Sequence, residues 1–60
     1  MTGTVPAGWV IVDGDGLPAG PPCAEKSDAL RRMGILAQRG ARLPLRLYAP
    51  DGSPTGDRLP

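Results

Sequence analysis

Apolar positions along the chain fall into three groups, and the first group predicts a β-strand. Residues 9–12 join a tryptophan to three β-branched residues, and Asp-Gly-Asp-Gly follows at residues 13–16. This pattern is typical of a strand that ends in a tight turn, because glycine tolerates positive φ and aspartate bonds its own backbone. Since four successive positions are apolar, we expect a central strand that is covered on at least one face.

The second group has the period of an α-helix over residues 28–39. Ser27 is the expected N-cap, and Gly40 is the expected C′ residue at the other end. One side of this helix carries the apolar residues that we expect to pack on a sheet, namely Ala29, Leu30, Met33, Leu36 and Ala37. Gly34 lies at the margin of that side, where a missing side chain would allow close approach to the sheet.

The third group alternates between apolar and other residues over residues 41–50, which is typical of a strand with one buried face. The buried positions are expected to be Leu43, Leu45 and Leu47. Pro50, Asp51 and Gly52 then predict a turn. Residues 57–60 form either a last short strand or a frayed tail.

The remaining segments complete the predicted plan. Residues 17–23 (LPAGPPC) form a short irregular edge strand or a loop, because Pro18 removes a ladder donor. Residues 1–7 are expected to be a flexible N-terminal segment, and residues 8–58 a single domain. We therefore predict an α+β fold with one helix packed on a small mixed three-stranded sheet (ββαβ). A right-handed crossover through the helix would make the first and last strands parallel neighbours and leave the other sheet face bare.

Four short motifs resemble those of the DUF2188-like ββαβ domains of prokaryotes and phages. They are WVIV, DGDG, SDAL and LRLYAPDG, within about residues 8–58. The resemblance implies a fold in which an aromatic-led strand and a glycine-rich turn precede the helix and an apolar last strand. Pro18, Pro21 and Pro22 depart from this pattern and leave the second strand open. The family has no established activity, so the resemblance implies a fold and not a function.

The length of the chain limits its stability, and its sequence patterns indicate a location. Sixty residues form at most one domain, and a chain this short buries only about 60% of its unfolded surface. The single Cys23 and the lack of histidine exclude an intramolecular disulfide and a Cys/His zinc cluster. We therefore expect a homodimer or a larger assembly. A cytoplasmic location is expected, because the sequence shows neither an apolar run that could cross a membrane nor the pattern of a secretion signal.

Candidate catalytic and metal-binding motifs fail when they are read residue by residue. A calcium loop counted from Asp13 would place Leu17, Pro18 and Ala24 where an oxygen ligand, a glycine and a glutamate are required. Cys23 has no base nearby in sequence, and a buried inert thiol is the simpler interpretation. A chain of this length also has little room for a pocket of several hundred Å³. We predict a protein that is not an enzyme and uses no cofactor, metal or small-molecule substrate.

The remaining signal is positive charge, since residues 29–50 hold five arginines and no acid although the net charge is only +1. Arg31, Ile35 and Arg39 form a stripe opposite the apolar side of the helix. An isoleucine flanked by arginines suits a protein interface, and the plain alternative is a solvated helix face with one incidental isoleucine. Our leading hypothesis is an interaction module, a phage or bacterial accessory factor, that self-associates through the bare sheet face, binds a macromolecular protein partner through this stripe, or does both.

Nucleic-acid binding through the arginine-rich helix and last strand is the alternative hypothesis. Arg42, Arg46 and Tyr48 are expected to share one strand face, which would suit a phosphate backbone and a stacked base. The simpler alternative for these arginines is pairing with Asp13, Asp15 or Asp57. A third hypothesis is a structural subunit that fills a groove in a larger assembly.

Overall fold

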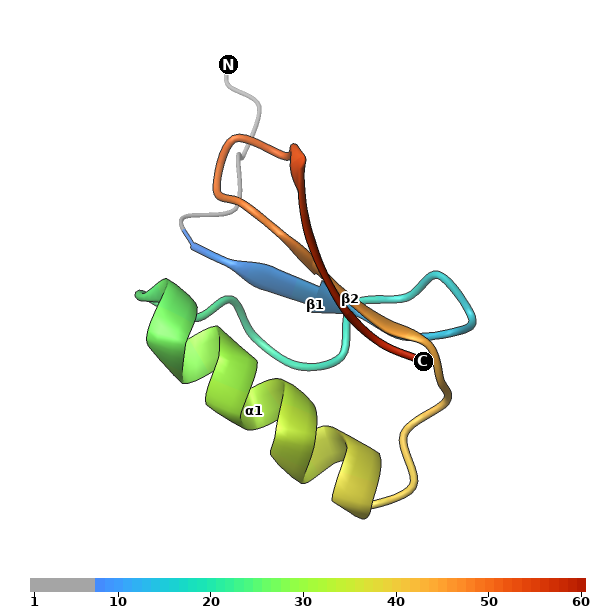
Figure 1. The fold of residues 1–60 in the computed structure, drawn as a ribbon. Coiled ribbons are helices and arrows are strands. Elements are labelled where there is room, and N and C mark those ends of the chain that lie inside the picture. Colours follow the sequence, from blue (N-terminus) through green and yellow to red (C-terminus); the bar gives the residue numbers. More distant parts are fainter. Residues whose placement is uncertain (1–7) are drawn as a thin grey trace.

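The computed structural model describes residues 8–60, so the segment 1–7 that was predicted to be flexible lies outside the described residues. The elements follow the order β1 (Val10–Val12), α1 (Lys26–Gln38), β2 (Leu45–Tyr48) and β3 (Pro54–Leu59). Helix α1 packs on one face of a three-stranded sheet with strand order β1-β2-β3 (Figure 1). The predicted α+β class, with one helix on a small three-stranded sheet, is confirmed.

The predicted strand direction is wrong, because the sheet is antiparallel and not mixed. β1 and β2 are neighbours as expected, but they pair in opposite directions, with Val10 opposite Tyr48 and Val12 opposite Arg46. The reason is a chain reversal before the helix, where residues 17–23 run back along β1 and form single bridges at Val12↔Pro18 and Trp9↔Cys23. The helix therefore starts near the beginning of β1, and the strand that follows it runs against β1.

Both edges of the sheet carry features that hinder further strand pairing. The segment 17–23, predicted to be either a short irregular edge strand or a loop, forms two isolated bridges along the outer edge of β1. β2 is the central strand of the sheet. The backbone bonds of the segment 17–23 include Trp9 N to Cys23 O at 2.8 Å and Ala19 N to Ile11 O at 2.7 Å. At the other edge, β3 starts with a proline, and its register with β2 shifts beside Gly56, which has a φ of +89°. Prolines and bulges are the usual protection of an edge strand.

The two ends of α1 match the sequence prediction unequally. The helix begins at Lys26 with Glu25 as N-cap, so Ser27 lies inside the first turn and the predicted Ser27 cap is wrong. Glu25 makes no side-chain capping hydrogen bond. At the other end Gly40 has a φ of +88°, and the N–H groups of Gly40 and Ala41 donate to Ala37 O and Leu36 O at 3.2 and 3.0 Å. This is a Schellman motif, which confirms Gly40 as the C′ residue.

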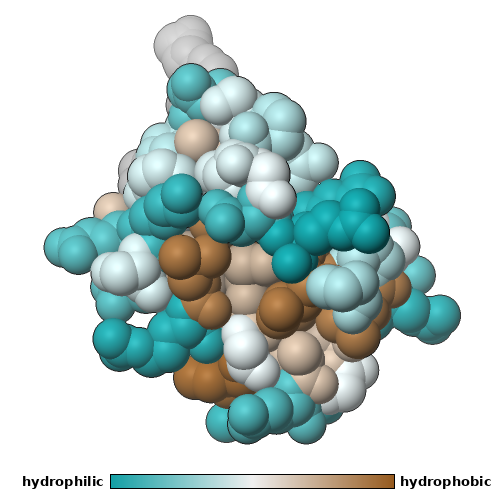
Figure 2. Space-filling view, viewed as in Figure 1, coloured by the Kyte–Doolittle hydropathy of each residue, from teal (hydrophilic) through white to brown (hydrophobic). Residues whose placement is uncertain are grey.

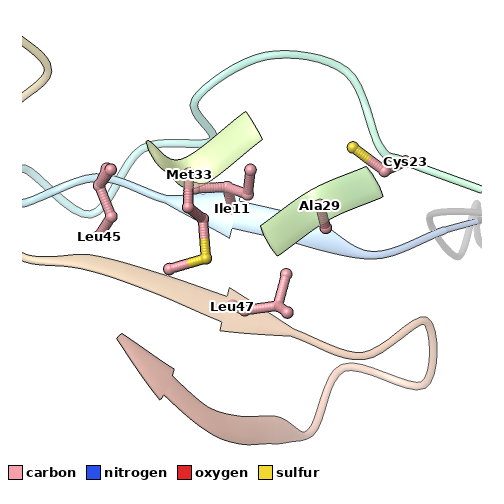
Figure 3. Packing of buried hydrophobic residues seen from close by; sticks show 6 residues of the cluster. All are labelled: Ile11, Cys23, Ala29, Met33, Leu45 and Leu47. Carbon is pink, nitrogen blue, oxygen red and sulfur yellow. The ribbon is translucent and has the colours of Figure 1, made fainter. Parts of the chain in front are cut away.

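The core lies between α1 and the sheet, where side chains from both layers meet (Figure 3). The buried residues of this core are Ile11, Cys23, Ala29, Met33, Leu45 and Leu47. Leu36 and Ala37 pack against it as predicted. Leu30 and Leu43, both predicted to be buried, keep 42% and 45% of their surface exposed.

The wrong predictions for Leu43 and Leu30, and the one for a close approach at Gly34, have separate physical reasons. Leu43 precedes the first residue of β2, so the strand alternation does not reach it. Leu30 lies on the flank of α1 beside an open hollow of about 180 Å³ next to β3. Figure 2 shows hydrophobic side chains exposed around this hollow. At Gly34 a Cβ atom would meet no atom of residues 8–60 within 4 Å, so the expected close approach to the sheet is absent.

The predicted turn after β2 is present and leads into a longer last strand than expected. Gly52 N donates to Ala49 O at 2.8 Å, and the Asp51 carboxylate accepts hydrogen bonds from the backbone and hydroxyl of Ser53. These hydrogen bonds from Ser53 lower the pKa of Asp51. β3 starts at Pro54, three residues before the segment that was expected to be either a strand or a frayed tail.

Candidate binding surfaces

A large hollow, here named the helix groove, lies between the outer side of α1 and the segment that precedes it. Its volume is about 600 Å³, and it is lined by Pro22, Cys23, Ala24, Asp28, Arg31, Arg32, Ile35, Leu36 and Arg39. The three residues predicted to bind a partner therefore line one groove. The hollow is also larger than the sequence led us to expect of a sixty-residue chain.

Ile35 provides the main exposed apolar surface of the helix groove. It keeps 44% of its surface exposed, because it points away from the core formed by Ala29 and Met33 on the other side of α1. Leu36 is partly buried against the core and lines the same groove. The groove thus offers an apolar surface that the packing of helix on sheet leaves uncovered.

Three arginines surround this apolar surface. The only acid that lines the groove is Asp28, and the ion pairs within residues 8–60 are Lys26–Asp57 at 3.3 Å and Arg42–Asp15 at 3.7 Å. Arg31, Arg32 and Arg39 therefore form no ion pair in the part of the chain that the structure describes. A guanidinium group in this state can donate two parallel hydrogen bonds to an external carboxylate or phosphate.

A second candidate surface, here named the open sheet face, lies on the side of the sheet opposite α1. It is formed by the residues that alternate with the core positions, namely Val10, Val12, Arg46, Tyr48 and Arg58. Val12 is opposite Arg46, and Arg46 is opposite Arg58, so these three residues form one row across the sheet. A groove of about 390 Å³ along this face is lined by Val12, Asp13, Gly14, Gly16, Pro44, Arg46 and Tyr48.

The structure brings together two of the three residues predicted for nucleic-acid binding. Arg46 and Tyr48 line the same groove, whereas Arg42 precedes β2. The Nε atom of Arg42 lies 3.7 Å from Asp15 Oδ2, so pairing with an acid holds for Arg42 and not for Arg46. Arg58 was missed, because the last residues were left open as a strand or a tail. A strand continued from the turn through residues 57–59 would have placed Arg58 on the face opposite Asp57 and Leu59.

The Asp-Gly-Asp-Gly stretch forms a tight turn. The carboxylate of Asp13 accepts hydrogen bonds from the N–H groups of Asp15 and Leu17 at 2.9 and 3.1 Å. These bonds make Asp13 the residue that closes the turn. Cys23 has a free thiol and is buried in the core next to the helix groove.

Comparison of the chain with known proteins finds no relative. No protein-family model matches the chain, and neither a curated protein nor a solved structure matches it. Within residues 8–60, no helix has the length and apolar character that crossing a bilayer requires.

Proposed function

We propose that this chain is a non-enzymatic interaction module that binds an acidic segment of a protein partner in the helix groove. The observation that supports this proposal is the exposed Ile35 beside three arginines that form no ion pair within residues 8–60. Arginine is enriched among the interface residues that contribute most to binding, and such residues lie in well-packed pockets from which water is excluded.

The geometry indicates what kind of segment would fit. Arg31 and Ile35 of α1 and the C-cap residue Arg39 are spaced four residues apart. They therefore span about 12 Å, at about 1.5 Å per helical residue. About four residues of an extended peptide cover this length. A partner segment with carboxylates at its ends and an aliphatic side chain between them would pair with both arginines. It would also cover Ile35, whose full burial contributes about 1.5–3 kcal/mol relative to full exposure.

Self-association has weaker support in the geometry than an acidic partner. Two copies that met through the helix groove by a two-fold axis would bring the same arginines together. Two copies that met through the open sheet face would do so for Arg46 and Arg58. We therefore favour a partner of opposite charge, and the homodimer remains a prediction for light scattering to decide.

Peptide titration tests the proposed function. The probe is a fluorescent peptide of sequence Glu-Ser-Leu-Ser-Glu, in which both glutamates and the leucine share one face of an extended chain. Its matched control replaces each glutamate by glutamine. Fluorescence anisotropy should show that the acidic peptide binds at least about tenfold tighter, a difference of about 1.4 kcal/mol. Ile35→Gln should weaken binding of the acidic peptide, because it removes the apolar anchor and keeps a residue of good helix propensity.

The control variant is Arg58→Gln, which removes an exposed arginine outside the helix groove. It should leave peptide binding unchanged, whereas Arg31→Gln should weaken it. Equal affinity for the acidic and the neutral peptide would contradict the proposal. So would an Ile35→Gln protein that keeps its circular dichroism spectrum and binds the peptide as tightly as the original chain.

A further inference from the structure

Two arginines face each other across neighbouring strands on the open sheet face. Arg46 and Arg58 are direct partners in the register of β2 and β3, and both are exposed. Like charges at directly opposite positions destabilise an antiparallel pair. Within residues 8–60, neither arginine forms an ion pair that would offset this repulsion. An anion bound between the two guanidinium groups would relieve it.

The only tyrosine of the chain lies on the same face. Tyr48 is two residues from Arg46 along β2, at a distance of about 7 Å for one repeat of a strand, and it is half-buried between Val10 and Pro54 on the neighbouring strands. Its position therefore sets an aromatic ring beside the arginine pair. Aromatic rings on a sheet, combined with arginines that hold phosphates, are the usual means of binding unpaired bases.

We infer that the open sheet face binds single-stranded nucleic acid, with Arg46 and Arg58 on the phosphates and Tyr48 stacked against a base. A single strand fits better than a duplex, because the bases of a duplex are already stacked and cannot reach a ring on a sheet. Asp13, which follows β1, also lines this groove, and its carboxylate repels phosphate. The bound nucleic acid therefore lies on the side of the open sheet face where β3 carries Arg58.

This inference rests on a different surface from the proposed function. Among the residues that the structure describes, none lines both the helix groove and the groove of the open sheet face. Each surface therefore supplies a control variant for the other.

Titration of labelled oligonucleotides tests the inference. The probes are ten-nucleotide oligo(U) and oligo(dT), with a duplex of oligo(dT) and oligo(dA) of the same length as the comparison. Protein is added up to about 1 mM, since contacts of this kind bind with a Kd of about 10⁻⁴–10⁻⁶ M. Two neutralised phosphates should give a slope of about −1.4 in log K against log salt. That slope corresponds to about sevenfold weaker binding at 200 mM than at 50 mM salt.

Variants on the open sheet face identify the contacts. Arg58→Gln should reduce the salt slope by about 0.7, because one phosphate contact is lost. Tyr48→Leu should weaken binding by about 5- to 150-fold, the range measured for loss of one stacked base. Arg31→Gln, in the helix groove, should change neither value. Arg58→Gln replaces an exposed side chain and is the variant expected to leave the fold intact if Tyr48→Leu does not.

Several outcomes would overturn the inference. These are a lack of binding to both oligonucleotides at about 50 mM salt, equal binding of the duplex, and binding that Arg58→Gln leaves unchanged in both strength and salt slope. Loss of peptide binding in Ile35→Gln with oligonucleotide binding retained would show that the two surfaces act separately. An Arg31→Gln protein that loses oligonucleotide binding would move the nucleic-acid contact to α1 and contradict our assignment.

Discussion

Two glycines of this chain differ in how much space surrounds them, although the sequence alone does not distinguish them. A Cβ atom at Gly8 would lie 2.3 Å from the backbone oxygen of Cys23, which also accepts a hydrogen bond from Trp9. A Cβ atom at Gly34, within α1, would meet nothing within 4 Å in the described part of the chain. Glycine is thus required where the edge segment approaches β1, and it is only a destabilising residue inside the helix.

Gly34→Ala should therefore stabilise the fold. Alanine in a helix interior is favoured over glycine by about 0.5–1 kcal/mol, and no neighbour opposes the added methyl group. Gly8→Ala should destabilise by about 1–3 kcal/mol, because backbone must shift to accept the methyl group. Urea unfolding followed by circular dichroism measures both changes. A less stable Gly34→Ala protein would mean that Gly34 is needed for a contact between α1 and the sheet.

Single residues also show how far the periodicity of a sequence predicts a surface. The helical period correctly placed Ile35 outside the core, because that assignment needs only the direction of a side chain around α1. It failed at Leu30, because burial there depends on how much of the helix the sheet covers. That coverage is set by the bulged strand β3, whose pairing with β2 cannot be read from the helix itself.

At the scale of elements, the start of α1 is its weaker end. The C-terminus is closed by the Schellman bonds at Gly40, whereas the N-cap residue Glu25 has extended backbone angles and no side-chain hydrogen bond to the helix. Glutamate is too long to accept the backbone N–H bonds that aspartate or serine accept at this position. A residue that caps the first turn of α1 should therefore increase the stability of the helix.

Glu25→Asp should stabilise the protein by about 0.5–2 kcal/mol, because it supplies the capping acceptor and keeps the negative charge next to the helix dipole. Ser27→Ala is the matched control. Since Ser27 lies inside the helix, its replacement should cause no loss, whereas a true N-cap serine would cost about 1 kcal/mol. Thermal unfolding distinguishes the two cases, and a clear loss in Ser27→Ala would restore Ser27 as the cap.

Single elements were easier to predict than their order and directions, because the predicted order was ββαβ and the observed order is βαββ. The strand, helix, strand and turn were each visible as a local pattern of residues 9–52. Strand direction depends on the number of chain reversals between strands, and one reversal depends on residues 17–23, whose three prolines hide the pairing. The crossover rule was thus applied to the wrong pair of strands. The strand that precedes the helix is the edge segment, and it does run parallel to β2.

At the scale of the whole molecule, one polar network joins α1 to β3. Lys26 at the start of the helix lies 3.3 Å from Asp57, and the Thr55 hydroxyl lies 2.9 Å from the same carboxylate oxygen. The hydrogen bond from Thr55, and then the one from Lys26, lowers the pKa of Asp57 below its ordinary value of 3.8. The ionised form of Asp57 is therefore favoured by folding.

The sign of the pH dependence follows from this shift. Because the folded pKa of Asp57 is lower than the unfolded one, its contribution to stability is present above about pH 4 and is lost as the pH falls through the folded pKa. The original chain should thus lose more free energy of unfolding between about pH 7 and about pH 2 than Asp57→Asn loses. Thr55→Val should reduce the loss in part, and Asp51 contributes in the same direction. Equal losses in the original chain and Asp57→Asn, measured by urea unfolding, would contradict this.

The two edges of the sheet, which hinder further strand pairing, limit the kinds of complex that this chain can form. Neither the proline-rich segment beside β1 nor the bulged β3 offers a continuous row of free backbone groups to another chain. Addition of copy after copy into an open-ended fibre is therefore disfavoured. Recognition is left to side chains on the two faces, so titrations should saturate at a small whole-number stoichiometry, even at high protein concentration.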